Sequence, residues 1–236
     1  MPTQTKPIEL YFTATPNGRK VTIMLEELAV PYRLIPINIG KGDQFTPEFL
    51  AISPNNKIPA IVDPEGPDGE PISIFESGAI LKYLALKFGQ FYPADPREQV
   101  KVDEWLFWQV GGFGPMLGQN HHFNIYAPEK IPYAIKRYVD ETHRLYGVLD
   151  KQLLHQAAIG NDYVAGEFSI ADIAIIDWSN GYERQQIDIA EFPTFAAWRE
   201  RMRARPGTLR GLTVTVDLPS DLSQGSEAFK VLFGQR

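Results

Sequence analysis

The stretch NNKIPAIVD at residues 55–63, followed by FESGAI at residues 75–80, decides how the first third of this chain folds. Pro59 stands immediately before a short apolar strand, a position where its missing N–H group does not disturb strand pairing. Glu76 and Ser77 place a carboxylate and a hydroxyl at the opening of a helix, where unpaired N–H groups and the helix dipole favour an anion. The turn-rich residues between the two segments indicate that the flanking strands form a hairpin.

The segments around this stretch predict a β-α-β-α-β-β-α order of elements. A strand, a crossover helix and a second strand form a parallel pair, and the hairpin adds antiparallel strands, which is thioredoxin-like topology. Pro36 interrupts the second strand, so we expect that strand to lie at the edge of the sheet. The expected strands cover residues 8–12, 32–39, 60–63 and 72–75. Helices are expected over residues 18–28 and 77–88, with a short helix that is capped by Thr46.

After a linker that contains Pro93 and Pro96, the apolar pattern is helical throughout. Residues 170–178 are almost entirely apolar and should form a buried central helix, which begins with a capping box of Ser169 and Asp172. Further helices are expected over residues 100–109, 131–155 and 195–203, the first of them loosened by the glycines that follow. The predicted organisation is an α/β thioredoxin-like N-terminal domain (residues 7–90), an all-α C-terminal domain (97–212) and a mobile or partner-clasping tail (213–236).

The composition excludes several classes of function. The 236 residues carry a net charge of −6 with an isoelectric point of about 5.3, and they lack the basic stripe of a nucleic-acid surface. No apolar run approaches the roughly 18 residues of a membrane span, and the first residues lack a signal peptide's apolar core. We therefore expect a cytoplasmic protein that needs no membrane. There is no cysteine, so any thiol chemistry must use the thiol of a ligand.

Four motifs, taken in their order, resemble the glutathione transferase superfamily. They are TPNG at residues 15–18, NKIPA at 56–60, ES at 76–77 and GPMLGQNHH at 114–122. The first and last narrow the resemblance to the Nu class, whose members reduce disulfides with glutathione. The resemblance covers about residues 8–206. It implies the glutathione transferase architecture, a homodimer, and two glutathione molecules or one glutathione disulfide in each subunit.

The resemblance assigns glutathione-binding roles to residues of the first domain. Ile58 would pair with the ligand's backbone, its own bond to the following proline being cis. Ser77 would donate a hydrogen bond to the γ-glutamyl carboxylate, and Glu76 would pair with the ammonium group. Lys57 by charge and Gln44 by a hydrogen bond would reach the glycine end. From the residues alone, a trans proline, a plain helix cap, a solvated lysine and a flexible loop remain open interpretations.

The catalytic candidates, which would also contact glutathione, are Thr15 and Asn17. A glutathione thiol is mostly protonated at neutral pH, so catalysis requires that the thiolate be stabilised. A Thr hydroxyl or an Asn amide at a helix N-terminus offers a neutral donor aimed at sulfur. From the residues alone, a simple turn is the favoured interpretation of this segment. Tyr11 is the rival donor, but its place in the first strand favours a packing role.

In the helical half, the resemblance assigns Asn120, His121 and Arg137 to a second glutathione molecule. The adjacent His121 and His122 could suggest a metal site. They lack the i, i+4 spacing and acidic partner of a helical metal site, however, and we expect no metal.

The favoured activity is glutathione-dependent reduction of small disulfides. One glutathione thiolate attacks a disulfide sulfur, and a second resolves the mixed disulfide. The first alternative is a transferase that conjugates glutathione to electrophiles, which differs only in its acceptor pocket. The second is a non-enzymatic regulatory or scaffold protein, which would not need to keep Thr15, Asn17, Lys57, Glu76 and Ser77 together.

Overall fold

The computed structural model describes residues 4–218, 223 and 225–234, and their contacts divide them into two compact units. The sheet unit consists of the described residues of Met1–Phe88 and Arg210–Arg236, and the helical unit consists of Gly89–Leu209. The tail predicted at residues 213–236 lies within the range Arg210–Arg236 of the sheet unit. Its residues 219–222, 224 and 235–236 are outside the described residues.

The sheet unit has the predicted order of strands and helices, and the predicted α/β thioredoxin-like topology is confirmed. Its sheet has the strand order β2-β1-β3-β4, in which β1 and β2 are parallel and the other neighbours are antiparallel. The second strand lies at the edge, as Pro36 predicts, although it ends at that proline and not at Ile39. The elements are β1 (Ile8–Phe12), α1 (Pro16–Leu28), β2 (Tyr32–Pro36), α2 (Pro47–Leu50), β3 (Ala60–Asp63), β4 (Ile72–Phe75) and α3 (Ser77–Phe88).

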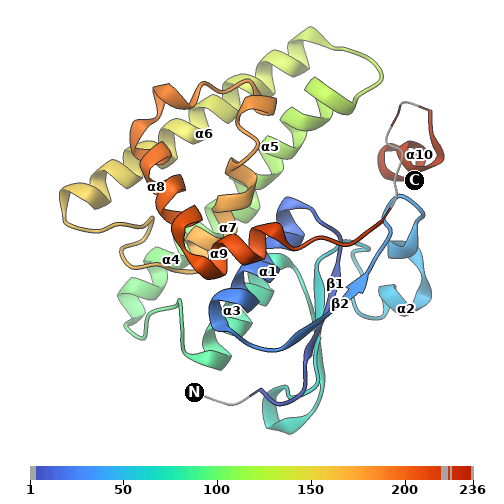
Figure 1. Cartoon of the computed structure of the whole chain (residues 1–236). Helices are drawn as coiled ribbons and strands as arrows, with labels where there is room; N and C mark the ends of the chain where they lie inside the picture. The colour runs from blue at the N-terminus through green and yellow to red at the C-terminus, as the bar shows by residue number, and fades with distance from the viewer. Residues whose placement is uncertain (1–3, 219–222, 224, 235–236) are drawn as a thin grey trace. The chain divides into compact units, whose positions relative to one another are not determined.

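The two faces of the sheet are covered differently. Ile8, Leu10 and Phe12 alternate along β1 and are completely buried, as a period of two requires for one covered face. Helices α1 and α3 pack against each other on one side of the sheet (Figure 1). On the opposite side, Phe49 of α2 joins a small apolar cluster against which Tyr11 packs.

Helix α1 is tied to the chain segment around Gly211. The Thr22 hydroxyl donates a hydrogen bond of 2.7 Å to the Gly211 carbonyl oxygen. A Cβ atom at Gly211 would lie 2.4 Å from the Cα of Ile23, so only glycine permits this backbone approach. Beyond it, Ser226 caps a further helix, so the segment predicted as a tail without periodicity is helical in part.

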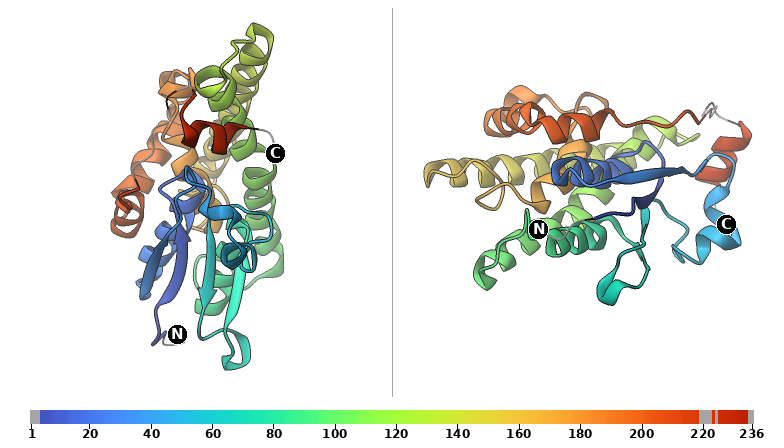
Figure 2. Two further views of the ribbon diagram at one scale, coloured as in Figure 1. Left: turned by 90° about the vertical axis from the view of Figure 1, so that its right-hand side faces the viewer. Right: turned by 60° about the horizontal axis from the view of Figure 1, so that its bottom comes forward.

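The helical unit is all-α, as the sequence predicts, and its long helix α6 packs against α5 and α8 (Figure 2). Helix α7 is the buried helix that its apolar sequence predicts. Its helices are α4 (Pro96–Trp108), α5 (Gly114–His121), α6 (Pro132–Ala158), α7 (Ile170–Ser179) and α8 (Pro193–Ala204). Helix α9 (Pro206–Thr213) begins in this unit and ends in the sheet unit, to which α10 (Glu227–Phe233) also belongs.

The start of α7 is fixed by a completely buried carboxylate. Asp172 accepts hydrogen bonds from the backbone N–H of Val164 at 3.0 Å and from the indole Nε1 of Trp198 at 2.9 Å. Together with Ser169 it forms the predicted capping box. The glycine-rich segment after α4 stays helical and passes through wide π-helical turns at Gln109–Phe113 and His122–Tyr126, so the helical stretch is longer than the sequence predicts.

None of the described helices is both long enough and apolar enough to cross a membrane.

A buried ion-pair network joins β3 to the end of α3. Asp63 is completely buried and accepts hydrogen bonds from the Lys87 ammonium, from the Tyr83 hydroxyl at 2.7 Å and from the backbone N–H of Glu65 at 2.9 Å. Burial opposes ionisation of this carboxyl, but the hydrogen bonds outweigh burial and lower the pKa of Asp63 below its usual value.

We expect Asp63→Asn to lower the free energy of unfolding by about 3 kcal/mol, because it leaves the Lys87 ammonium without its counter-charge. Since the folded-state pKa of Asp63 is depressed, its contribution is present above the unfolded pKa and is lost as pH falls through the folded value. The variant should therefore lose less stability than the parent on acidification below about pH 4. Denaturant titrations at several pH values measure both effects. Glu104→Gln, at an exposed pair with Lys101, is the control and should change stability by less than about 0.5 kcal/mol.

Candidate active site

The register of the sheet brings three turns of the chain to one edge. Ala60, the first residue of β3, pairs with Tyr11 near the end of β1 and with Phe75 at the end of β4. The turn before α1, the turn before β3 and the turn before α3 therefore meet. A cavity of about 130 Å³ lies there, lined by Asn17, Ser53, Asn55, Lys57, Ile58, Pro59, Phe75, Glu76 and Ser77. Five residues predicted for ligand binding are among them, and Thr15 and Gln44 are not.

Thr15 is the N-cap of α1. Its hydroxyl oxygen accepts a hydrogen bond of 3.1 Å from the N–H of Gly18, and a hydroxyl that accepts can still donate its own hydrogen. A Cβ atom at Gly18 would lie 2.4 Å from the carbonyl oxygen of Thr13, so the turn requires glycine. This close approach places Asn17, the second residue of the helix, at the cavity.

The bond between Ile58 and Pro59 is cis, as the resemblance predicts. The loop that leads to it is held from inside, because the buried Ser53 hydroxyl donates a hydrogen bond of 2.9 Å to the carbonyl oxygen of Lys57. The Lys57 side chain is exposed at the mouth of the cavity. Ser53 is a functional candidate that the sequence analysis missed; only its position before the proline motif could have indicated it.

Glu76 joins β4 to α3 in a strained conformation. Its φ of 68° lies in the left-handed region, which costs a non-glycine residue about 1–3 kcal/mol and is found most often at functional sites. Its carbonyl oxygen accepts the N–H of Ile80 at 2.9 Å and so begins the helix. The Glu76 side chain is exposed, whereas Ser77 is only 8% exposed. The carboxylate therefore lies nearer to solvent than the serine hydroxyl.

A buried lysine that the sequence analysis missed lies behind Ser77. Lys20 on α1 is 1% exposed, and its ammonium Nζ is 3.2 Å from the Ser77 Oγ. Burial lowers the pKa of Lys20 to about 7, and the negative charge of Glu76 opposes the shift. The signal was present in the sequence. Lys20 precedes Met24 by four residues and therefore interrupts the apolar stripe of the helix with a charge.

Gln44 lies in the short turn Asp43–Phe45, outside the lining of the cavity. Its Nε2 donates to the carbonyl oxygen of Ile39 at 3.2 Å, while its buried Oε1 has no hydrogen-bond partner among the described residues. A ligand N–H group could satisfy this oxygen, but only after a local movement exposes it.

Tyr11 is engaged elsewhere. Its hydroxyl donates to the Glu9 carboxylate at 3.3 Å, and its ring lies 6.0 Å from that of Phe49. Burial and the adjacent Glu9 raise the pKa of Tyr11, which further disfavours a role in activating a thiol. The packing role predicted for this residue agrees with these contacts.

The residues predicted for a second glutathione lie in the helical unit. Asn120 is buried, and its amide donates to the Thr142 hydroxyl and to the Gln185 carbonyl oxygen, both at 3.0 Å. These bonds occupy both N–H donors of the amide and give Asn120 a packing role, while its buried Oδ1 has no hydrogen-bond partner among the described residues. His121 is partly buried, and its Nε2 has no hydrogen-bond partner among the described residues. Arg137 is exposed in a hollow on the surface of α6.

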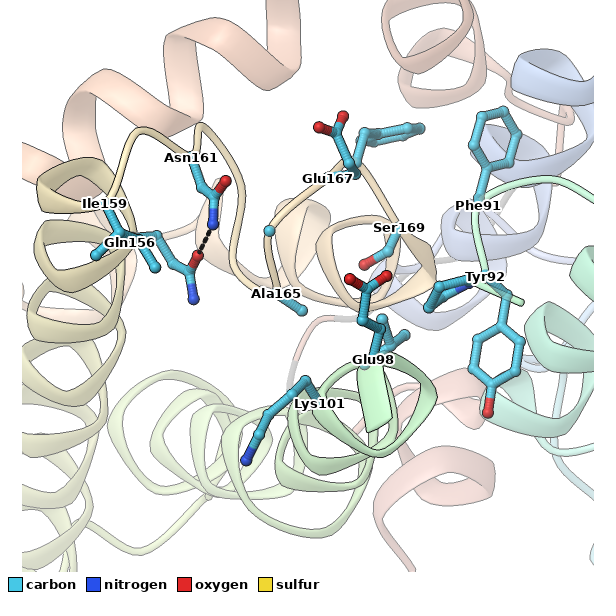
Figure 3. Close-up of a pocket in the computed structure, with 14 residues that line it drawn as sticks. Phe91, Tyr92, Glu98, Lys101, Gln156, Ile159, Asn161, Ala165, Glu167 and Ser169 are labelled. Carbon is cyan, nitrogen blue, oxygen red and sulfur yellow. Dashed lines mark hydrogen bonds between the residues drawn. The ribbon is translucent and has the colours of Figure 1, made fainter. Parts of the chain in front are cut away.

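The helical unit also holds a larger cavity of about 520 Å³, between the beginning of α4, the end of α6 and the segment before α7 (Figure 3). Its polar lining includes Glu98, Lys101 and Glu167, and Asn161 donates a hydrogen bond of 2.7 Å to Gln156. None of the predicted site residues lines it. The larger volume therefore does not identify the site, because polar residues predicted for ligand binding line the smaller cavity.

Within the described part of the chain, no three His, Asp or Glu side chains come together in a way that could hold a metal ion.

Two family models match the chain. The model of the glutathione S-transferase N-terminal domain matches residues 14–87, and that of the C-terminal domain matches residues 121–206. The disulfide-bond oxidoreductase YfcG of Escherichia coli (strain K12) is 57% identical over 206 residues, which are 87% of this chain and 94% of that protein.

Solved structures agree with the family models. A glutathione transferase family member from Pseudomonas fluorescens, solved with two glutathione bound, is 43% identical with a TM-score of 0.81, over 89% of this chain and 95% of that one. A glutathione transferase from Pseudomonas putida, solved with one glutathione disulfide per subunit, is 41% identical with a TM-score of 0.82, over 88% and 91% of the two chains.

We expect Thr15→Val to lower the free energy of unfolding by about 1 kcal/mol, because it removes the hydroxyl that caps α1 while keeping the branched shape. Thr15→Ser keeps the cap and should remain within a few tenths of a kcal/mol of the parent. Thermal and urea unfolding of the two variants measure the difference. Equal stability of the two would contradict the capping role.

Proposed function

The chain belongs to the glutathione transferase family, and from this premise we propose that it is a glutathione-dependent disulfide-bond reductase of the Nu class. The observation that supports this best is the cavity that gathers Asn17, Ile58, Glu76 and Ser77 in a chain without cysteine. Such a site can orient and activate a ligand's thiol, but the protein itself cannot form a mixed disulfide.

The cavity fits a γ-glutamyl peptide group by group. Ser77 and the N-terminal N–H groups of α3 are donors for the α-carboxylate, and the exposed Glu76 is the partner for the ammonium group. The backbone of Ile58 pairs with the cysteinyl unit, and Lys57 reaches the glycine carboxylate. Gln44 would join the glycine end after the local movement that exposes its Oε1.

Asn17 and Thr15 are the proposed catalytic donors. Both lie at the beginning of α1, where the positive end of the helix dipole and neutral donors stabilise a thiolate without a change in their own charge. Asn17 lines the cavity and is the primary donor. Thr15 caps the helix and can add its hydroxyl hydrogen.

In the overall reaction, two glutathione thiols and one substrate disulfide give two product thiols and glutathione disulfide. The substrate S–S bond is broken, the S–S bond of glutathione disulfide forms, and the protons of the two glutathione thiols pass to the product thiolates. We propose that Arg137, with His121 and Asn120, holds the second glutathione in the subunit, which would serve the resolving step. No metal takes part in this scheme.

We further propose that the enzyme is a cytoplasmic homodimer, as the family resemblance implies. Val100 and Phe107 are 54% and 63% exposed and lie seven residues apart on α4, so one face of that helix offers apolar surface that a second copy could cover. The substrate is a small-molecule disulfide, or an electrophile if the enzyme conjugates.

Reduction and conjugation are distinguished by a direct comparison. We expect glutathione-dependent reduction of bis(hydroxyethyl) disulfide, coupled to glutathione reductase, to be faster than conjugation to chlorodinitrobenzene. This expectation follows the disulfide-bond oxidoreductase YfcG, to which the chain is 57% identical. Rapid conjugation with negligible disulfide turnover would establish the transferase instead. Glutathione binding with neither activity would establish the regulatory or scaffold function.

We expect Asn17→Ala to lower kcat/KM for disulfide reduction by roughly 5- to 150-fold, which corresponds to losing one donor worth about 1–3 kcal/mol in the transition state. Asn55→Ala, which also alters the lining of the cavity but comes from the segment before β3 and not from α1, is the matched control and should stay within about threefold. Tyr11→Phe should keep most of the activity. A collapse confined to Tyr11→Phe would transfer the catalytic role to that tyrosine.

A further inference from the structure

The buried contact between Lys20 and Ser77 has no role in the proposed reaction as described so far. Lys20 comes from α1 and Ser77 from the first turn of α3, two helices that pack against each other. The lysine is 1% exposed, so its ammonium group cannot meet a ligand directly. Burying an ammonium group is costly unless a partner compensates it, so a lysine here requires an explanation beyond packing.

The hydrogen bond between the two residues has a direction that matters for the site. In its charged form Lys20 has only donors, so its Nζ donates to the Ser77 Oγ, which lies 3.2 Å away. An anion bound beyond Ser77 favours that charged form. Ser77 therefore uses a lone pair toward the interior of the protein. Its own hydroxyl hydrogen is then left to donate to an acceptor, and Ser77 lines the cavity.

The charges around Ser77 alternate in sign. Lys20 is positive and lies behind Ser77, whereas Glu76 is negative, exposed, and close enough to counter the effect of burial on the pKa of Lys20. A zwitterionic amino-acid group would continue this alternation, with its ammonium group toward Glu76 and its carboxylate toward Ser77. An α-carboxylate in this position places a negative charge on the cavity side of Ser77, opposite the Lys20 ammonium group.

We propose that Lys20 is a positioning residue that makes this subsite specific for an α-carboxylate. It orients the Ser77 hydroxyl as a donor toward the cavity, and its positive charge strengthens that donor. The inference rests on the proposed function, because it assigns the γ-glutamyl end of glutathione to this wall of the cavity. Lys20 acts through Ser77 and touches no reacting atom.

The test compares two ligands on the parent protein and on variants of Lys20 and Ser77. S-methylglutathione carries the α-carboxylate, and its decarboxylated counterpart, in which γ-aminobutyrate replaces the γ-glutamyl unit, keeps the ammonium group but lacks the carboxylate. Calorimetry measures both dissociation constants for the parent, Lys20→Met and Ser77→Ala. Lys20→Met keeps much of the shape of the side chain and removes the charge. Lys6→Met, at an exposed lysine, is the control and should change neither constant.

We expect Lys20→Met to weaken S-methylglutathione by about tenfold and the decarboxylated ligand by less than about twofold, since the lost interaction is with the carboxylate alone. Because Lys20 acts through Ser77, the double variant should bind S-methylglutathione no more than about threefold more weakly than Ser77→Ala alone. Lys20→Gln keeps a donor to Ser77 without the charge and is the second test if Lys20→Met does not fold; its loss should also be confined to the carboxylate ligand.

Equal weakening of both ligands, or of neither, would overturn the role of Lys20 and leave the glutathione site intact. If the parent protein binds neither glutathione nor S-methylglutathione, the proposed function fails first. The two failures are therefore distinguishable.

Discussion

The pairing of Ala60 with both Tyr11 and Phe75 is the constraint on which the site depends. Strand β3 is the only described strand that pairs antiparallel to two neighbours, so its beginning lies beside the ends of both. Each of those ends leads to a polar residue of the site: Asn17 at the beginning of α1 follows β1, and Glu76 follows β4. A shift of the register by one residue would separate these turns and would also turn the buried side chains of β3 to the other face. The same hydrogen bonds that form the sheet thus position the chemistry.

The chain contains no cysteine, and this limits what the site can do in disulfide chemistry. A protein without a thiol of its own can take part in disulfide chemistry only by holding and ionising the thiols of its substrates. The described site matches that task, because the groups at the proposed sulfur position, Asn17 and Thr15, are neutral donors at the beginning of a helix. Thr15 shows how closely stability and catalysis are linked here, since the hydroxyl proposed to assist the thiolate also caps the helix that supplies the dipole.

The sequence predicts the parts of this structure that depend on short-range rules. Pro36 predicts an edge strand because a proline cannot donate to a ladder, and Ser169 with Asp172 predicts the beginning of a helix because both orphan N–H groups find acceptors. The meeting of Asn17, Ile58 and Glu76 follows from topology, once the strand order is known. Gln44 and Asn120 show the limit of motifs, since a motif does not reveal whether a side chain's hydrogen bonds are already taken within the protein.

Lys20 and Ser53 escape prediction for a related reason. The apolar stripe of α1 marks Lys20 as unusual, but it does not reveal the contact with Ser77, which lies 57 residues away. Ser53 bonds to the nearby Lys57, but its burial is not visible in the sequence. A lysine on an apolar stripe is more often a snorkelling side chain whose ammonium group reaches water than a buried cation. Only the three-dimensional contact with Ser77 distinguishes the two cases.

Helix α3 is held at both ends by lysines, and this explains how a small cavity can be selective. Near its C-terminus, Lys87 on the helix and Asp63 on β3 form a buried pair that fixes the helix to the sheet. At its N-terminus, Lys20 on α1 holds Ser77, the first residue of the helix. A helix secured only at its far end could rock and let its first-turn donors follow any ligand. In the proposed role of Lys20, tying both ends keeps the donors in one direction, so that a ligand lacking a carboxylate at that place would leave them unsatisfied. Selectivity then comes from the cost of unpaired groups as much as from attraction, which is how rigid polar sites discriminate between similar small molecules.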